Sequence, residues 1–288
     1  MFIGVKKMEW IYQLNFIERG VIAGVIIALI CPIIGAFLLV RRVSIISESL
    51  SHITLTGISA GALLGGTSIW FADLNPMYMG VVFALVGSLL IEKLRQVYPH
   101  FQELAIPIIL SSGIGLSAIF ISLSTNSTQE WYAYLFGSIV SVTAADLHFI
   151  ILAAMSILLI VVLFYKEFIS ISFDLEHAKV SGVSVKLSNF IFSVLVALVI
   201  SISMKVVGIL LVGALIVIPV ATSIQFTKSF KQLMAYGILF AQAAVFSGIY
   251  FAYHFQLATG GTIVVSALVI LLVVLFITKQ KSAVKVHR

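Results

Sequence analysis

A carboxylate and an imidazole stand four residues apart in an apolar part of the sequence, at Glu48 and His52. Residues at positions i and i+4 lie on one face of a helix, so the two side chains can meet. Such a pair can share a borderline divalent cation such as zinc or manganese. Because ionisable groups inside a bilayer are costly, we expect this pair to be the place where a substrate ion binds.

The same residues also suit a purely structural role. Glu48 would complement the positive N-terminal end of a helix that Ser47 could cap. His52 would hydrogen-bond to a neighbouring helix. The spacing alone leaves the metal interpretation and the structural interpretation open.

The elements that position this pair follow from the composition. The chain has 288 residues, of which 61% are hydrophobic and only 10% are charged. A soluble protein of this composition would expose large apolar patches and aggregate. Repeated apolar runs near the length of a membrane crossing instead predict an all-α fold, a polytopic transmembrane helix bundle forming a single domain over 1–288. We expect about nine spans, at 18–40, 50–70, 76–94, 104–123, 146–165, 187–204, 206–226, 233–254 and 262–278.

A tenth apolar stretch, Trp131 to Val142, is too short to cross a bilayer comfortably. We interpret it as a re-entrant or interfacial helix. Its aromatic residues Trp131, Tyr132 and Tyr134 are typical of a membrane interface.

The basic residues set the orientation. With the N-terminus outside, most of the 17 basic residues fall in inner loops and in the C-terminal tail. The outer side keeps Lys6, Lys7, Arg19 and Lys205. The positive-inside rule favours this arrangement, which makes the C-terminus and the loop at 166–187 cytoplasmic. The basic residues behind the net charge of +6 therefore indicate membrane orientation and not nucleic-acid binding.

The most polar helix-capable stretch inside the chain runs from Ser172 to Gly182. Asp174 can cap a short helix that contains Glu176 and Ala178, and Gly182 can end it. From the residues alone, this stretch is a solvated loop that carries one helical turn or two.

A few other residues could act in an ion path. Pro219 interrupts the hydrogen-bond ladder of its span and could serve as a kink or gate element, or only pack. Lys205 lies between two apolar segments and is expected to snorkel to the interface. Asp146 lies near a span end, where water is accessible. His148 and His254 lie near outer ends and could guide a cation.

Four stretches together resemble one family, the permease subunits of bacterial zinc and manganese ABC importers. Two arginines, Arg41 and Arg42, are followed by Glu48-Ser-Leu-Ser-His52, where the family usually has Asp-Ala-Leu-Ser-His. The other three stretches are 134–139, 206–221 and 260–265. The family's metal-path Asp and His correspond to Glu48 and His52. Glutamate for aspartate keeps the charge but adds a methylene.

This resemblance implies a transport subunit and not an enzyme. The sequence contains no Gly-x-x-x-x-Gly-Lys-Ser/Thr phosphate loop, so ATP hydrolysis falls to a separate subunit. The implied assembly has two permease copies, two ATPase copies and an extracellular metal-binding protein in a bacterial cell membrane. The resemblance also implies a coupling helix that docks on the ATPase, in the stretch with Asp174, Glu176, Ala178 and Gly182.

The resemblance implies no permanently bound cofactor, only a transported ion. Zinc is placed first, because imidazole suits zinc, and manganese second. An ion-coupled secondary carrier is a more remote alternative, which paired broken helices would indicate. An intramembrane metalloprotease would need His-Glu-x-x-His, which this sequence lacks.

Overall fold

The computed structural model describes residues 10–67, 75–124 and 128–286. Within these residues every regular element is a helix. In chain order the helices are α1 (Trp10–Gln13), α2 (Phe16–Val40), α3 (Ile46–Thr67), α4 (Pro76–Val97), η3 (Gln102–Leu104), α5 (Ala105–Leu123), α6 (Thr128–Phe136), α7 (Ala144–Leu163), α8 (Tyr165–Phe173), α9 (Leu175–Val180), α10 (Val185–Val207), α11 (Ile209–Ser223), α12 (Phe230–Phe255) and α13 (Thr259–Val286).

The all-helical bundle is confirmed, and each of the nine predicted spans corresponds to one helix. Seven of these are long and apolar enough to cross a bilayer. The two exceptions are α3 and α11. Helix α3 has 22 residues, but serines, threonines, Glu48 and His52 lower its hydropathy. Helix α11 has 15 residues, or about 22 Å at 1.5 Å per residue, which is short of the hydrocarbon thickness.

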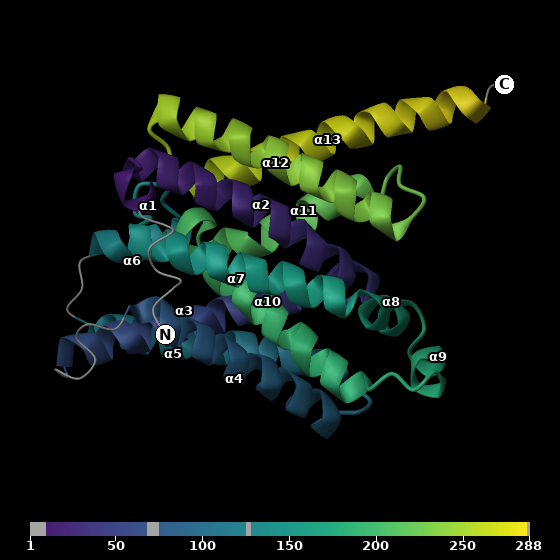
Figure 1. Ribbon diagram of the computed structural model, residues 1–288, viewed down its shortest axis with the longest axis horizontal. Coiled ribbons are helices and arrows are strands. Elements are labelled where there is room, and N and C mark those ends of the chain that lie inside the picture. Colours follow the sequence, from purple (N-terminus) through teal and green to yellow (C-terminus); the bar gives the residue numbers. More distant parts are fainter. Residues whose placement is uncertain (1–9, 68–74, 125–127, 287–288) are drawn as a thin grey trace.

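The bundle is arranged around three central helices, α2, α10 and α11 (Figure 1). Helices α3, α4 and α5 pack together on one side, and α12 and α13 pack together on the other. Helix α7 packs against both α2 and α10. Helix α3, which carries Glu48 and His52, packs against α4 and α5 and also contacts the central helices α11 and α10.

Helices α10 and α11 run in opposite directions along α2 and are separated by a break of one residue. The break is Gly208, with φ of 87° and ψ of 153°, a conformation that only glycine adopts readily. Helix α6 and the loop after it fill the space at this break. A Cβ on Gly208 would lie 2.4 Å from the Gly137 nitrogen, so the two backbones touch. The predicted short helix is therefore α6, ending at Phe136, and its chain then turns back against α10.

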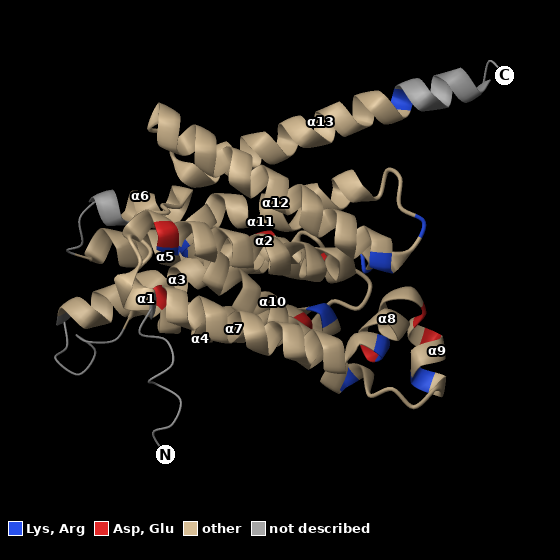
Figure 2. Ribbon diagram, turned by 45° about the horizontal axis from the view of Figure 1, so that its top comes forward, with Lys and Arg blue, Asp and Glu red and all other residues tan. Residues whose placement is uncertain are grey.

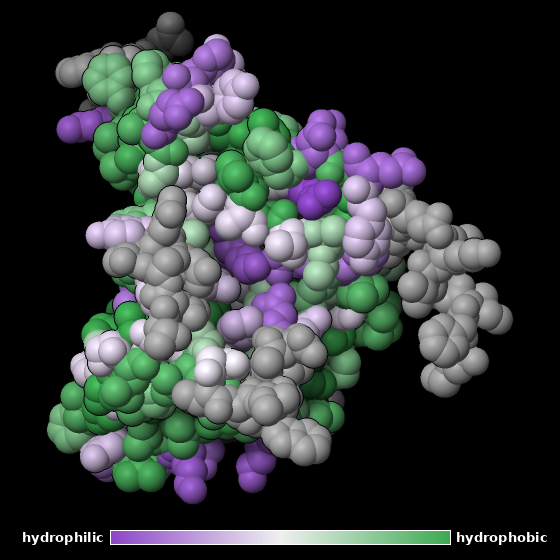
Figure 3. Space-filling view, turned by 90° about the vertical axis from the view of Figure 1, so that its left-hand side faces the viewer, coloured by the Kyte–Doolittle hydropathy of each residue, from purple (hydrophilic) through white to green (hydrophobic). Residues whose placement is uncertain are grey.

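The charged residues gather at the two ends of the bundle and leave a middle zone with few charges (Figure 2). One end carries α8, α9 and the distal part of α13, with many lysines and arginines. The other end carries α1 and α6. Figure 3 faces this second end, where hydrophilic side chains gather in the middle of the described surface. The predicted outer-side residues Lys6 and Lys7 lie outside the described residues.

Candidate functional site

Glu48 and His52 lie in the first two turns of α3. The helix begins at Ile46, so Glu48 belongs to its first turn, where a carboxylate complements the helix dipole. Ser47 does not cap the helix as the sequence predicted. It lies inside the first turn, and its hydroxyl donates to the Ser44 carbonyl at 2.7 Å. The capping prediction was wrong because the helix starts one residue earlier than Ser47.

The two candidate ligands face each other. The Nε2 atom of His52 lies 3.6 Å from the Oε1 atom of Glu48. The His52 side chain is only 13% exposed, whereas that of Glu48 is 40% exposed. An ion could therefore reach the carboxylate first and the imidazole second. Among the described residues no group of three or more His, Cys, Asp or Glu side chains gathers around one point, so none of these residues gives the pair a third ligand of these types.

Two neighbouring helices shape the site. A Cβ on Gly213 of α11 would lie 2.8 Å from the Oε2 atom of Glu48, so the carboxylate packs directly on the α11 backbone. On the other side, Gly113 of α5 lies against the backbone of His52. The Thr56 hydroxyl donates to the Gly113 carbonyl at 2.9 Å and fixes α3 against α5. Glycines at both contacts let α11 and α5 approach α3 closely beside the pair.

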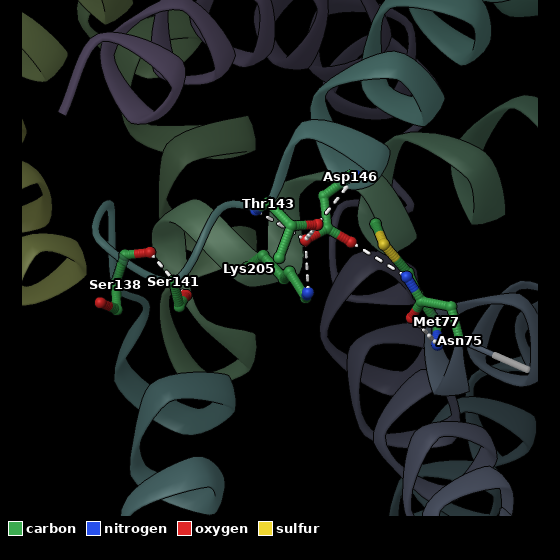
Figure 4. Close-up of polar contacts among 7 residues, drawn as sticks. All are labelled: Asn75, Met77, Ser138, Ser141, Thr143, Asp146 and Lys205. Atoms are coloured by element: carbon green, nitrogen blue, oxygen red, sulfur yellow. Dashed lines mark hydrogen bonds and ion pairs between the residues drawn. The ribbon is translucent and has the colours of Figure 1, made fainter. Parts of the chain in front are cut away.

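A second polar cluster joins three helices near the other end of α10 (Figure 4). The Nζ atom of Lys205 lies 2.5 Å from the Oδ2 atom of Asp146. The same carboxylate accepts hydrogen bonds from the Thr143 hydroxyl at 2.6 Å and from the Asn75 amide at 3.0 Å. The Lys205 carbonyl accepts from the Ser138 backbone N–H at 3.0 Å.

This cluster corrects two sequence predictions. Asp146 is fully buried and not in contact with water, and Lys205 is paired with it instead of snorkelling. The two residues are 59 positions apart, and α6 with its return loop covers them. The sequence signal that could have placed Asp146 is the capping box Thr143-x-x-Asp146, which marks the start of α7.

The predicted coupling segment forms a short helix with the expected boundaries. Asp174 caps α9 and accepts a hydrogen bond from the His177 backbone N–H at 2.9 Å. Gly182, with φ of 79°, ends the segment. Ala178 is fully buried, whereas Glu176 forms an exposed ion pair with Lys179. Helix α9 therefore has one face against the bundle and one face free for a partner.

Arg41 connects the coupling segment to the helix of the candidate ligands. It ends α2, five residues before α3 begins. Its guanidinium donates to the Ser172 hydroxyl on α8 at 2.9 Å and to the Asn189 side-chain oxygen on α10 at 3.2 Å. It also lies 4.1 Å from the centre of the Phe192 ring, a cation–π contact. Burial lowers the pKa of Arg41 to about 10, so the side chain stays charged at neutral pH.

The remaining candidates are dispersed. Pro219 is buried inside α11, and the Ser223 hydroxyl donates to its carbonyl at 2.8 Å. His148 contacts the Ala144 carbonyl and the Tyr12 ring. His254 is exposed and packs on the Tyr250 ring. Neither histidine lies in a group of candidate ligands among the described residues.

A polytopic helix bundle with an ionisable pair on a central helix and an exposed short helix at one end defines the class, a multi-pass membrane permease. The model of the ABC 3 transport family matches residues 13–278, and the chain belongs to this family. The matched range includes both Glu48 and His52 and the coupling segment.

Named relatives cover nearly the whole chain. The manganese transport system membrane protein MntC of Listeria monocytogenes is 30% identical over 274 residues, which is 95% of each chain. The manganese import system permease protein ScaB of Streptococcus gordonii is 27% identical over 278 residues, 96% of this chain and 97% of that one. Among solved structures, PsaBC from Streptococcus pneumoniae in complex with Fab matches with a TM-score of 0.83, 25% identity and 98% coverage of both chains.

Proposed function

We propose that this chain is the membrane permease of an ATP-driven manganese importer in a bacterial cell membrane. Glu48 and His52 form the transient site through which the ion passes. The observation that carries the proposal is the position of this pair, 3.6 Å apart on a central helix of a chain in the ABC 3 transport family. A site with only two protein ligands suits transport, because the ion must leave as well as bind.

Manganese replaces zinc as the first choice for the transported metal. The sequence alone favoured zinc because of the imidazole. The relatives MntC and ScaB are both named for manganese, which supports the manganese assignment for this chain. The chemistry of the pair is compatible with this metal, since carboxylate oxygen is a preferred manganese ligand and imidazole is an acceptable one.

The assembly we propose has two copies of this permease, two ATPase subunits and an extracellular metal-binding protein. The end with α8 and α9 faces the cytoplasm, as does the C-terminus. The concentration of basic residues at that end supports this orientation (Figure 2). The second permease copy would place another Glu48–His52 pair on the path and so supply further ligands beyond those that the described part of one chain provides.

In the proposed mechanism, motion of the ATPase enters through α9. Asp174, Glu176, Ala178 and Gly182 form this coupling segment. Arg41 then transmits the motion, because its guanidinium holds α8 and α10 while its backbone leads into α3. Pro219, which follows the Gly213 contact with Glu48 along α11, lets this helix bend and acts as the gate element.

Metal uptake by cells tests this function. Cells that express the permease with its ATPase and binding protein are given radioactive manganese or zinc separately. We expect ATP-dependent accumulation of manganese, and excess unlabelled manganese should compete more effectively than zinc. Accumulation of zinc alone would contradict the choice of metal. Accumulation of neither metal would contradict the importer assignment.

The exposed face of α9 yields a prediction about the ATPase. Val180 is 88% exposed, an unusual state for a valine, and the preceding Phe173 and Leu175 are also exposed. An apolar side chain at the centre of an interface commonly contributes enough for its loss to be severe. Val180→Asp should therefore lower ATPase affinity at least about tenfold.

Co-purification of the ATPase subunit with the tagged permease measures this effect. Val140→Asp is the matched control, because Val140 is also exposed, at 63%, and lies after α6 at the opposite end of the bundle. This control should retain the ATPase. Equal retention in both variants would show that the face carrying Val180 is not the docking surface.

A further inference from the structure

A cavity lined by three arginines lies beside the turn between α2 and α3. It has a volume of about 290 Å³ and includes Arg41, Arg42 and Arg95, with Glu92 on its wall. A neighbouring cavity of about 570 Å³ shares the same three arginines and extends toward Glu103. The guanidinium groups come from two separate segments, since Arg95 belongs to the last turn of α4.

These arginines lack anionic partners. In the described part of the chain no carboxylate lies within ion-pair distance of any of the three. The Nη2 atom of Arg41 and the Nε atom of Arg95 are buried and make no hydrogen bond. A buried guanidinium nitrogen without a partner is costly, and the three arginines outnumber Glu92 and Glu103, the carboxylates that line the two cavities. An anion with several oxygen acceptors relieves this cost and balances the excess of positive charge.

An apolar groove lies beside the charged cavity. It lies between α4 and α10, with a volume of about 170 Å³, and its lining includes Leu85, Leu89 and Phe190. Ser88 and Ser193 line both the groove and the cavity, so the two spaces are adjacent. Leu89 and Phe190 are each almost half exposed on the flank of the bundle. A ligand that fits both spaces has an anionic head and an apolar chain.

We propose that this composite site binds an anionic phospholipid from the inner leaflet, with its phosphate among Arg41, Arg42 and Arg95 and an acyl chain along the α4–α10 groove. Basic pockets between membrane helices on the cytoplasmic side are suited to such headgroups. Arginine suits phosphate because its planar fork donates two parallel hydrogen bonds. This site is separate from Glu48 and His52 and goes beyond the proposed transport function.

The bound lipid would join three parts of the coupling machinery. Its headgroup would link the α2–α3 turn to the end of α4, and Ser172 of α8 lines the same cavity. The lipid would thereby stiffen the connection that leads from α9 to the start of α3.

Lipid retention by the purified permease–ATPase complex tests the proposal. The complex is prepared in nanodiscs of phosphatidylcholine with or without phosphatidylglycerol, and retained lipids are counted by native mass spectrometry after transfer to detergent. The test variant is Arg42→Gln with Arg95→Gln, which leaves the structural contacts of Arg41 intact. The control is Lys228→Gln with Lys231→Gln, two basic residues of the α11–α12 connection and the start of α12 that line neither cavity.

Wild type and control should retain one phosphatidylglycerol per permease chain and melt at a higher temperature with it than in phosphatidylcholine alone. The arginine variant should bind this lipid about 30-fold more weakly, as expected for the loss of two basic residues near the headgroup. Equal retention in all three proteins would overturn the proposal. It would also be overturned if millimolar inorganic phosphate raised the melting temperature as much as the lipid, because a soluble anion would then be the ligand. Manganese uptake by the wild type tests the transport function separately, because its result does not depend on whether the lipid is retained.

Discussion

Cells carrying His52→Ala or Glu48→Gln should import manganese at no more than about a tenth of the wild-type rate, at matched membrane expression. Each substitution removes one of the two candidate ligands while leaving α3 intact, because neither side chain makes a hydrogen bond that holds the helix in place. Losing even a supporting partner of a metal ligand typically costs about 10- to 100-fold in affinity or activity, and losing a ligand itself should cost at least as much.

A variant that displaces the Glu48 carboxylate without removing it tests whether the position of this group matters for uptake. Gly213→Ala would place a methyl group 2.8 Å from the Glu48 Oε2 position and displace the carboxylate without removing it. We expect an intermediate loss of uptake. Gly115→Ala on α5 is the matched control, because a Cβ there meets nothing within 4 Å. Full uptake by the His52 and Glu48 variants would show that the pair is structural.

Lys205→Ala should destabilise the permease by about 3–5 kcal/mol, the usual cost of leaving one member of a buried ion pair without its partner. Asp146 is fully buried, and the ammonium group is the only positive charge within ion-pair distance of it among the described residues. Its loss would leave a buried carboxylate with only the neutral donors Thr143 and Asn75. The cluster holds the ends of α4, α7 and α10 together, so all three helix ends would loosen.

Thermal unfolding of the detergent-solubilised permease measures this destabilisation. The double variant Lys205→Met with Asp146→Asn should be more stable than Lys205→Ala, because it removes both charges at once. Lys179→Ala serves as the control, since its ion pair with Glu176 on α9 is exposed and contributes about 0–1 kcal/mol. A Lys205→Ala protein as stable as this control would mean that water solvates Asp146.

The sequence predicted the helices and the candidate ligands for physical reasons that are local. Apolar runs of membrane length must be helical, because a helix satisfies its backbone hydrogen bonds internally. The spacing of Glu48 and His52 brings their side chains together on one face of a helix. Asp174 and Gly182 mark the ends of α9 through their own capping geometry, which depends on neighbouring residues only.

The features that were not predicted depend on contacts between distant parts of the chain. Lys205 looked like an interfacial lysine because nothing near it in sequence offers a carboxylate. Only the packing of α7 against α10 brings Asp146 to it. The contact of Gly213 with Glu48 and the contacts of Arg41 with α8 and α10 are equally long-range.

Pulsed electron paramagnetic resonance of Mn²⁺ tests most directly whether the pair binds the transported ion. The spectrum would be recorded on the permease–ATPase complex without the binding protein and without nucleotide, so that neither contributes a manganese site. We expect a nitrogen coupling from an imidazole bound to Mn²⁺, which disappears in His52→Ala. A nitrogen coupling unchanged by that substitution, or Mn²⁺ held by oxygen ligands alone in the wild type, would show that His52 does not bind the ion.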